Sequence, residues 1–193
     1  VAAGGPSLAL VIDVVACAAA ALLLAHVRTP MGPQRRTGAR TRLRADMVEG
    51  LAFVLRHPVI RPLTLAGTLN SVAAGAVTGL VVVVAEVPGL LLTAIAAGGF
   101  LAAVCLPRLL RVVRLGRVTV GALVGGAPAL LLLALADTVA VAVIGLIGWG
   151  LATTLVALNG ISTRQQLTPD ALQSRVNTSA RMLAWGGTPF GAL

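Results

Sequence analysis

The chain has 193 residues, of which 58% are hydrophobic and only 11% are charged. An ordinary soluble domain has about 45–50% apolar and about 25% charged residues, so this composition excludes a soluble globular core. The formal net charge is +9, which in a soluble protein would suggest a nucleic-acid partner. Aromatic residues, which stack on bases, make up just 3% of the chain. We therefore expect no nucleic-acid binding.

The sequence begins with an apolar stretch from about Pro6 to Val27, followed by a basic segment that contains Pro and Gly. A helix rises about 1.5 Å per residue, so about 20 residues cross the roughly 30 Å hydrocarbon core of a membrane. We expect a transmembrane helix in residues 1–27 and a basic cytoplasmic linker in residues 28–62. Residues 63–193 are then a C-terminal transmembrane bundle.

Within the linker, a short helix is predicted from Leu43 to Arg56. Apolar residues recur there at helical spacing and charged residues take the other positions, which is typical of an amphipathic helix on a membrane surface. His57 and Pro58 end this helix, because a proline restricts the residue before it and cannot continue the helical hydrogen bonds.

Four more apolar stretches follow, and another is cut off by the end of the sequence. They cover 63–85, 90–106, 118–136, 139–158 and about 176–193. The stretch 90–106 is short, so we expect it to continue into the basic segment behind it. Glycine recurs inside the stretches, as close contact between helices in lipid requires. The expected fold is an all-α, polytopic membrane bundle of about six transmembrane helices.

All basic residues are arginines, and each falls on the same side of the membrane when the stretches are counted in alternation. The arginines occupy positions 28, 35, 36, 40, 42, 44, 56, 61, 108, 111, 114, 117, 164, 175 and 181. Cytoplasmic segments of membrane proteins carry an excess of Lys and Arg. We therefore expect the linker and the segments around Arg108 and Arg164 to face the cytoplasm, and the turns at Glu86 and Asp137 to face outward.

Several segments carry a family resemblance. They are RHPVIRPL (56–63), TRQQLTP (163–169), RVN (175–177) and LAWGGTPFGAL (183–193). With the order of the apolar stretches, they resemble the major facilitator superfamily, specifically bacterial exporters related to enterobactin and macrolide efflux proteins. The resemblance covers nearly the whole chain and equates its spans with helices six to eleven of a twelve-helix transporter. The chain would then be a C-terminal-half fragment.

This resemblance implies a secondary transporter in the plasma membrane, an efflux permease for small amphipathic molecules that works by alternating access and proton antiport. Its partners would be the lipid bilayer, the missing N-terminal half and the small-molecule substrate, with no cofactor and no metal. Arg108, Arg111, Gly116 and Arg117 resemble the degenerate second copy of the family's loop motif. The chain departs from the family in two places, because these arginines have no acidic companion and the outer turn at Glu86 is short.

A polar stripe follows one face of the span that starts at residue 63. It consists of Thr64, Thr68, Ser71, Gly75 and Thr78, spaced by 4, 3, 4 and 3 residues, with Asn70 beside it. Such a stripe can line an aqueous path for a substrate. Small residues and hydroxyls also favour tight packing between helices. Both interpretations stay open, and the hydroxyl residues with Asn70 are the candidate substrate-path residues.

Asp13 is the only acidic residue well inside a span. A carboxylate at the centre of a membrane helix costs about 2.5–3.5 kcal/mol on insertion scales, which nearby Leu, Ile and Val residues offset by about 0.3–0.6 kcal/mol each. One interpretation is a proton-relay or ion-pair site. The other is a group near the outer interface that bonds a neighbouring helix or water.

The polar segment from Asn159 to Arg175 contains Thr168 followed by Pro169, a pattern typical of a helix start with Thr168 as its cap. A gating contact with the other half of a transporter is the alternative. The sequence holds no nucleophile with a base, no phosphate-binding loop and no metal cluster, so we expect no catalytic residues and no enzyme. The other functional interpretations are a permease subunit of an ATP-driven pump, a membrane-bound transferase and an inactive remnant.

Overall fold

The computed structural model describes residues 5–26, 43–84 and 87–193, and these residues form helices and no strand. The helices are α1 (Gly5–Ala25), α2 (Leu43–Arg56), α3 (Ile60–Val84), α4 (Pro88–Val112), α5 (Leu115–Ala134), α6 (Val139–Leu167), α7 (Gln173–Trp185) and α8 (Thr188–Ala192). The chain divides into two compact units, residues 1–40 and 41–193. Helix α1 belongs to the first unit, and α2 to α8 form the second.

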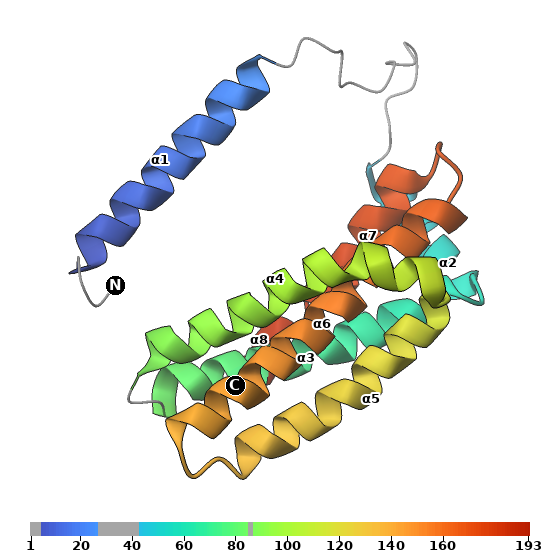
Figure 1. The fold of residues 1–193 in the computed structure, drawn as a ribbon. Helices are drawn as coiled ribbons and strands as arrows, with labels where there is room; N and C mark the ends of the chain where they lie inside the picture. Colours follow the sequence, from blue (N-terminus) through green and yellow to red (C-terminus); the bar gives the residue numbers. More distant parts are fainter. Residues whose placement is uncertain (1–4, 27–42, 85–86) are drawn as a thin grey trace. The chain divides into compact units, whose positions relative to one another are not determined.

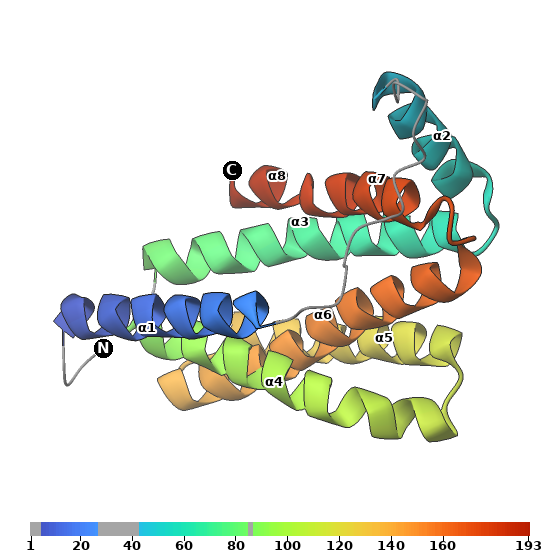
Figure 2. The ribbon, with the colours of Figure 1, turned by 90° about the horizontal axis from the view of Figure 1, so that it is seen from above.

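Helix α6 is the centre of the second unit. It packs along α4 on one side and α5 on the other, and α3 also contacts it (Figures 1 and 2). Of the most apolar part of α6, 39% is buried, compared with 17% for α3. Helices α7 and α8 lie along α3, and α2 packs against α7. The all-α fold that the sequence predicts is confirmed.

Large apolar side chains cover much of the outer surface of this bundle. On α5 the buried residues are mostly small, whereas Val120 and Val124 are 61% and 68% exposed. On α4, Ala94, Gly98 and Ala102 are buried while Phe100 is 68% exposed. Large apolar side chains on the outside with small residues at the helix contacts are what packing in lipid requires, and in water they would form an extended apolar surface.

Glycines allow the closest helix contacts. A Cβ added at Gly98 would clash with the carbonyl oxygen of Ile147, and one at Gly150 would clash with that of Ile95. The backbones of α4 and α6 therefore touch at two places, as the frequent glycines predict. Gly121 behaves differently, because a Cβ there would meet no atom within 4 Å.

Two helices run further than hydropathy alone indicates. Helix α4 continues through Pro107 to Val112, as expected for a short apolar stretch. Helix α6 continues past residue 158 to Leu167, so most of the predicted polar inner loop is helical. Hydropathy does not predict this extension, because it treats the polar residues Asn159 and Thr163 as exposed. In the structure both are buried in the bundle.

Asn159 is the polar link between α5 and α6. Its side-chain nitrogen donates to the carbonyl oxygen of Leu115 at 2.7 Å and to the hydroxyl of Thr119 at 2.6 Å. The hydroxyl of Thr163 donates to the carbonyl oxygen of Asn159 at 2.8 Å. Interhelical hydrogen bonds of this kind contribute about 0.6–1.7 kcal/mol each in membrane bundles, so Asn159 fixes the start of α5 against α6.

The predictions for the C-terminal region need correction. Thr168 does not start a helix, because it is the C-terminal cap of α6 and α7 begins later, at Gln173. The expected last span is two short helices separated by Gly186 and Gly187. Among the described residues, four helices, α3 to α6, are long and apolar enough to cross a membrane. The count of about six is therefore not confirmed.

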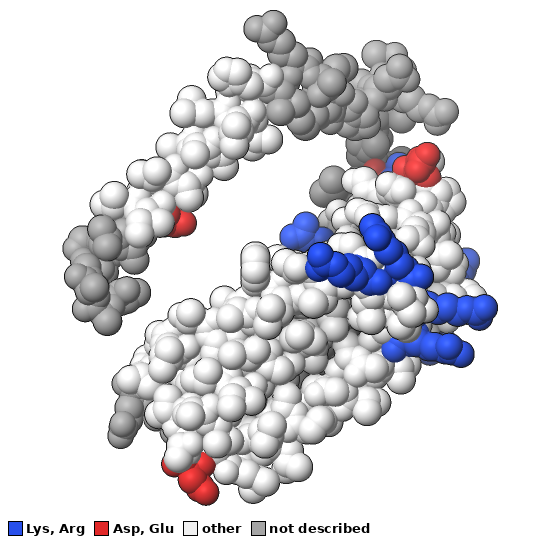
Figure 3. Space-filling model, in the orientation of Figure 1, with Lys and Arg blue, Asp and Glu red and all other residues white. Residues whose placement is uncertain are grey.

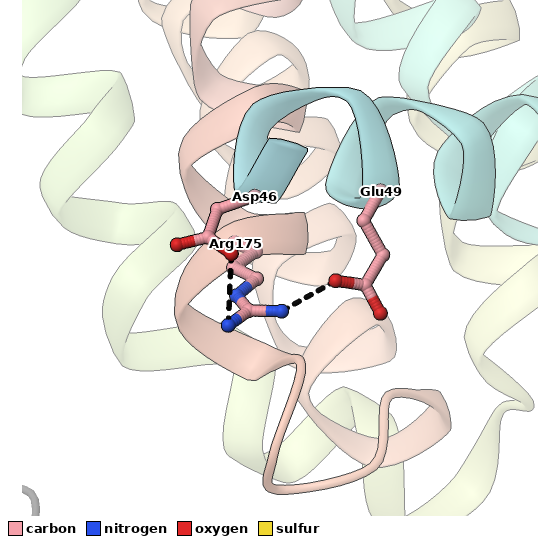
Figure 4. A network of polar contacts seen from close by, with 3 residues as sticks. All are labelled: Asp46, Glu49 and Arg175. Atoms are coloured by element: carbon pink, nitrogen blue, oxygen red, sulfur yellow. Dashed lines mark hydrogen bonds and ion pairs between the residues drawn. The ribbon is translucent and has the colours of Figure 1, made fainter. Parts of the chain in front are cut away.

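Helix α2 has the predicted bounds, and it packs against α7. Val54 and Ile60 are at most 1% exposed and form a small core with Val176 and Ala180 of α7. At the rim of this contact, Arg175 pairs with Asp46 at 3.0 Å and also with Glu49 (Figure 4). Among the described residues of the predicted apolar face of α2, only Val54 is buried in this contact, whereas Met47, Leu51 and Leu55 are 46%, 37% and 50% exposed. The membrane-surface position of α2 stays a prediction.

Candidate functional site

The arginines of the bundle gather at one end of it. At this end α3 begins, α4 ends, α5 begins and α6 ends, as the alternating direction of the four helices requires. Figure 3 shows the basic side chains around this end, near α2, α7 and the turn between α4 and α5, whereas the long side that this view shows is almost free of charge. The predicted one-sided distribution is therefore present in the folded bundle for the described arginines.

A cavity of about 330 Å³ opens between α3, α6 and α7 near the arginine-bearing end. Its polar lining consists of Asn70 and Ser71 of α3, Arg164 of α6, and Asn177 and Arg181 of α7. Apolar residues, among them Leu63, Ile161 and Trp185, complete the wall. Polar groups from three helices thus converge on one space within an otherwise apolar bundle, which is the usual form of a ligand site between helices.

A second cavity, of about 230 Å³, lies between α3, α5 and α6. It is mostly apolar and reaches Trp149, which is only 4% exposed. Asn70 and Val156 line both cavities. The two spaces therefore adjoin at Asn70, and together they follow the contact between α3 and α6 from the arginine-bearing end toward the middle of the bundle.

The predicted substrate-path residues do not all lie on one surface. Asn70 and Ser71 line the cavity between α3, α6 and α7. Thr68 instead donates to the carbonyl oxygens of Thr64 and Leu183, at 3.0 and 3.3 Å, and so joins α3 to α7. Thr64 is buried and Thr78 is exposed. Packing between helices thus accounts for Thr68, whereas a substrate path along Asn70 and Ser71 stays a prediction.

The packing part of the stripe continues toward α8. A Cβ added at Gly75 would clash with the carbonyl oxygen of Thr188, and one at Gly191 would clash with that of Val72. Helices α3 and α8 are therefore in backbone contact there. This contact leaves no room for a ligand between Gly75 and α8.

The other predicted site residues of the second unit do not line the cavity. Asp13 is an exposed residue in α1, which belongs to the separate first unit. Arg108 and Arg111 are exposed in the last turns of α4, and Gly116 and Arg117 are exposed in the first turn of α5. A Cβ at Gly116 would meet no atom within 4 Å, so close packing does not require a glycine there. Glu86 lies outside the described residues.

Sequence reasoning missed the role of Arg164. It was expected in a polar loop, but it lies in the last turn of α6, is only 7% exposed and lines the cavity. A helix that continued past residue 158 would place Arg164 within one and a half turns of Asn159 and Gly160, but this spacing does not show whether the side chain is buried. Asn177, on α7, lies inside the expected last span but was not singled out either.

No family model, curated protein or solved structure matches the chain. In the part of the chain that the structure describes, no three His, Cys, Asp or Glu residues gather in a way that could hold a metal ion. The function must therefore be argued from the bundle and its cavities.

Proposed function

We propose that the chain is part of a polytopic secondary transporter in the cell membrane. The observation that carries this proposal is the polar cavity of α3, α6 and α7, which adjoins an apolar cavity inside a bundle whose outer surface is large and apolar. A protein that only anchors in the membrane does not require polar groups from three helices around an empty space, because each polar group inside the lipid costs free energy.

The proposed transporter is of the major facilitator type and exports small amphipathic molecules. Support comes from the segments that resemble bacterial exporters and from the two adjoining cavities, one polar and one apolar. A molecule with a polar and an apolar part fits such a pair of spaces. In this proposal the chain supplies helices six to eleven, and transport proceeds by alternating access against a first half, driven by proton antiport.

Efflux measurements test the proposal. The whole open reading frame that encodes this chain should lower the accumulation of an amphipathic dye in cells that lack their own exporters, whereas residues 1–193 alone should have no effect. Ser71→Leu should abolish efflux because it fills the polar cavity, and Leu65→Ala, on the exposed side of α3, should leave efflux unchanged. Energy-dependent efflux by residues 1–193 alone would contradict the half-transporter proposal, and no efflux by the whole reading frame would contradict transport.

The orientation of the bundle can be tested separately with an impermeant thiol reagent on intact cells. In a background in which Cys17 and Cys105 are replaced, a cysteine at Asp137 should react, because that turn is expected outside. A cysteine at Gly116 should react only after the membrane is opened. Both positions are exposed and lie at helix ends, so a difference in labelling reports the side of the membrane. Labelling of Gly116→Cys in intact cells would overturn the orientation.

A further inference from the structure

The cavity between α3, α6 and α7 contains a buried positive charge without a counter-charge. Arg164 is only 7% exposed, and among the described residues its Nε has no hydrogen-bond partner and its guanidinium joins no ion pair. No Asp or Glu lines the cavity. Burial of a charged guanidinium without a partner is strongly unfavourable, so the free cavity lacks a group that would stabilise it.

A second arginine lines the same space. Arg181 of α7 lies over the ring of Trp185 with its guanidinium carbon 4.8 Å from the ring centroid, a position that restrains the charge beside the cavity. The ion pairs among the described residues are formed by Arg175, which does not line this cavity. Two guanidinium groups on one cavity favour an anion with several oxygen atoms, such as a phosphate or a carboxylate.

The rest of the wall suits an apolar body attached to that anion. Leu63, Ile161 and Trp185 contribute apolar surface, whereas Ser71 and Asn177 supply neutral hydrogen-bonding groups. Asn177 also has a buried side-chain oxygen without a partner. The volume of about 330 Å³ lies at the small end of the range for ligand sites, about 300–1,000 Å³. The cavity accommodates the head group of an amphiphile and the first carbons of its alkyl chain.

We propose that this cavity binds the anionic head of an amphiphile, with its phosphate or carboxylate on Arg164 and Arg181 and its apolar part along Leu63 and Trp185. The source of the anion is either a phospholipid of the bilayer or a free amphipathic acid. The proposal concerns binding alone and does not depend on transport, so it is tested without a transport assay.

The test uses the fluorescence of Trp185 in the purified chain, held in phosphatidylcholine nanodiscs, with Trp149 replaced by Phe in every sample so that one reporter remains. Decyl phosphate is the probe, and decanol is its uncharged counterpart. We expect a saturable change with decyl phosphate and none with decanol. Arg164→Gln should weaken binding by at least about tenfold, which is the loss of one charge-assisted hydrogen bond.

Arg111→Gln is the matched control, because it removes the same charge from an exposed position at the same end of the bundle. It should leave the affinity unchanged. Arg181→Gln, which is also an exposed position, should weaken binding and serves as a second variant. In the absence of ligand, Arg164→Gln should also raise the thermal midpoint, since it removes a buried unpaired charge, and a given concentration of decyl phosphate should raise the midpoint less in Arg164→Gln than in the unsubstituted chain.

Two further arms identify the source of the anion. Phosphatidylglycerol added to the nanodiscs should compete with decyl phosphate if the bilayer supplies the ligand, and decanoate should compete if a free amphipathic acid does. Competition by either supports the proposal. Equal affinities in Arg164→Gln and Arg111→Gln would overturn it, as would an equal response to decanol or the absence of any saturable response in the folded chain.

Discussion

Gly98→Leu should separate α4 from α6 and lower the free energy of unfolding by about 3 kcal/mol, the upper end of the range for overpacking. The reason is that a side chain at Gly98 would meet the backbone of α6, at the carbonyl of Ile147 and the amide of Leu151. A backbone inside a helix cannot move aside as the end of a flexible side chain can. The midpoint of denaturation in a detergent titration, followed by circular dichroism, measures the effect.

Gly121→Leu is the matched control for this prediction. Gly121 is an exposed residue of α5, and a Cβ there would meet no atom within 4 Å. The exchange of Gly for Leu changes helix propensity equally in both variants, so the difference between them isolates the contact of α4 with α6. Equal shifts in the two midpoints would mean that close packing at Gly98 does not stabilise the bundle.

The helices themselves were largely predictable, because apolar length and proline positions leave few choices. The bounds of α2 follow from an amphipathic pattern that stops before Pro58, and those of α4 from an apolar stretch too short to stand alone. The end of α6 was not predictable in this way. Hydropathy treats Asn159 and Thr163 as the start of a loop, whereas both side chains donate hydrogen bonds inside the bundle.

The candidate site was predictable only in part. The helical spacing identified a polar face of α3, but it could not say which neighbour each residue meets. The structure turns Ser71 toward the cavity and Thr68 toward the carbonyl of Leu183, although both belong to the same stripe. Arg164 was missed because its burial depends on α3 and α7. These are contacts between distant segments, which no local pattern contains.

Apolar burial and ion pairs both hold α2 on α7, and their contributions to stability can be compared. Val54 is 1% exposed, and burial of a valine side chain stabilises by about 1.5–3 kcal/mol. The ion pairs of Arg175 are partly exposed, with the Arg175 side chain at 34% and that of Glu49 at 53%. Pairs of this kind contribute about 0–1 kcal/mol. Apolar burial should therefore dominate.

Val54→Asp should accordingly release α2 from α7, because it removes the valine's burial and places a carboxylate in the apolar core. Hydrogen exchange of the α2 amides, measured by mass spectrometry, should then accelerate by more than about tenfold, since each 1.4 kcal/mol corresponds to about a factor of ten. Val48→Asp, at a position 65% exposed, should leave the exchange unchanged. Arg175→Gln should accelerate it by less than about fivefold.

The same release should reach the cavity, because α7 forms both contacts. Val176 and Ala180 pack against α2, while Asn177 and Arg181, the next residues along the chain, line the cavity. Val54→Asp should therefore weaken the binding of decyl phosphate as well as loosen α2, whereas Val48→Asp should change neither. Faster exchange in α2 with unchanged binding would show that α7 keeps its place without α2. A larger effect of Arg175→Gln than of Val54→Asp would mean that the ion pairs, rather than the apolar core, hold α2 on α7.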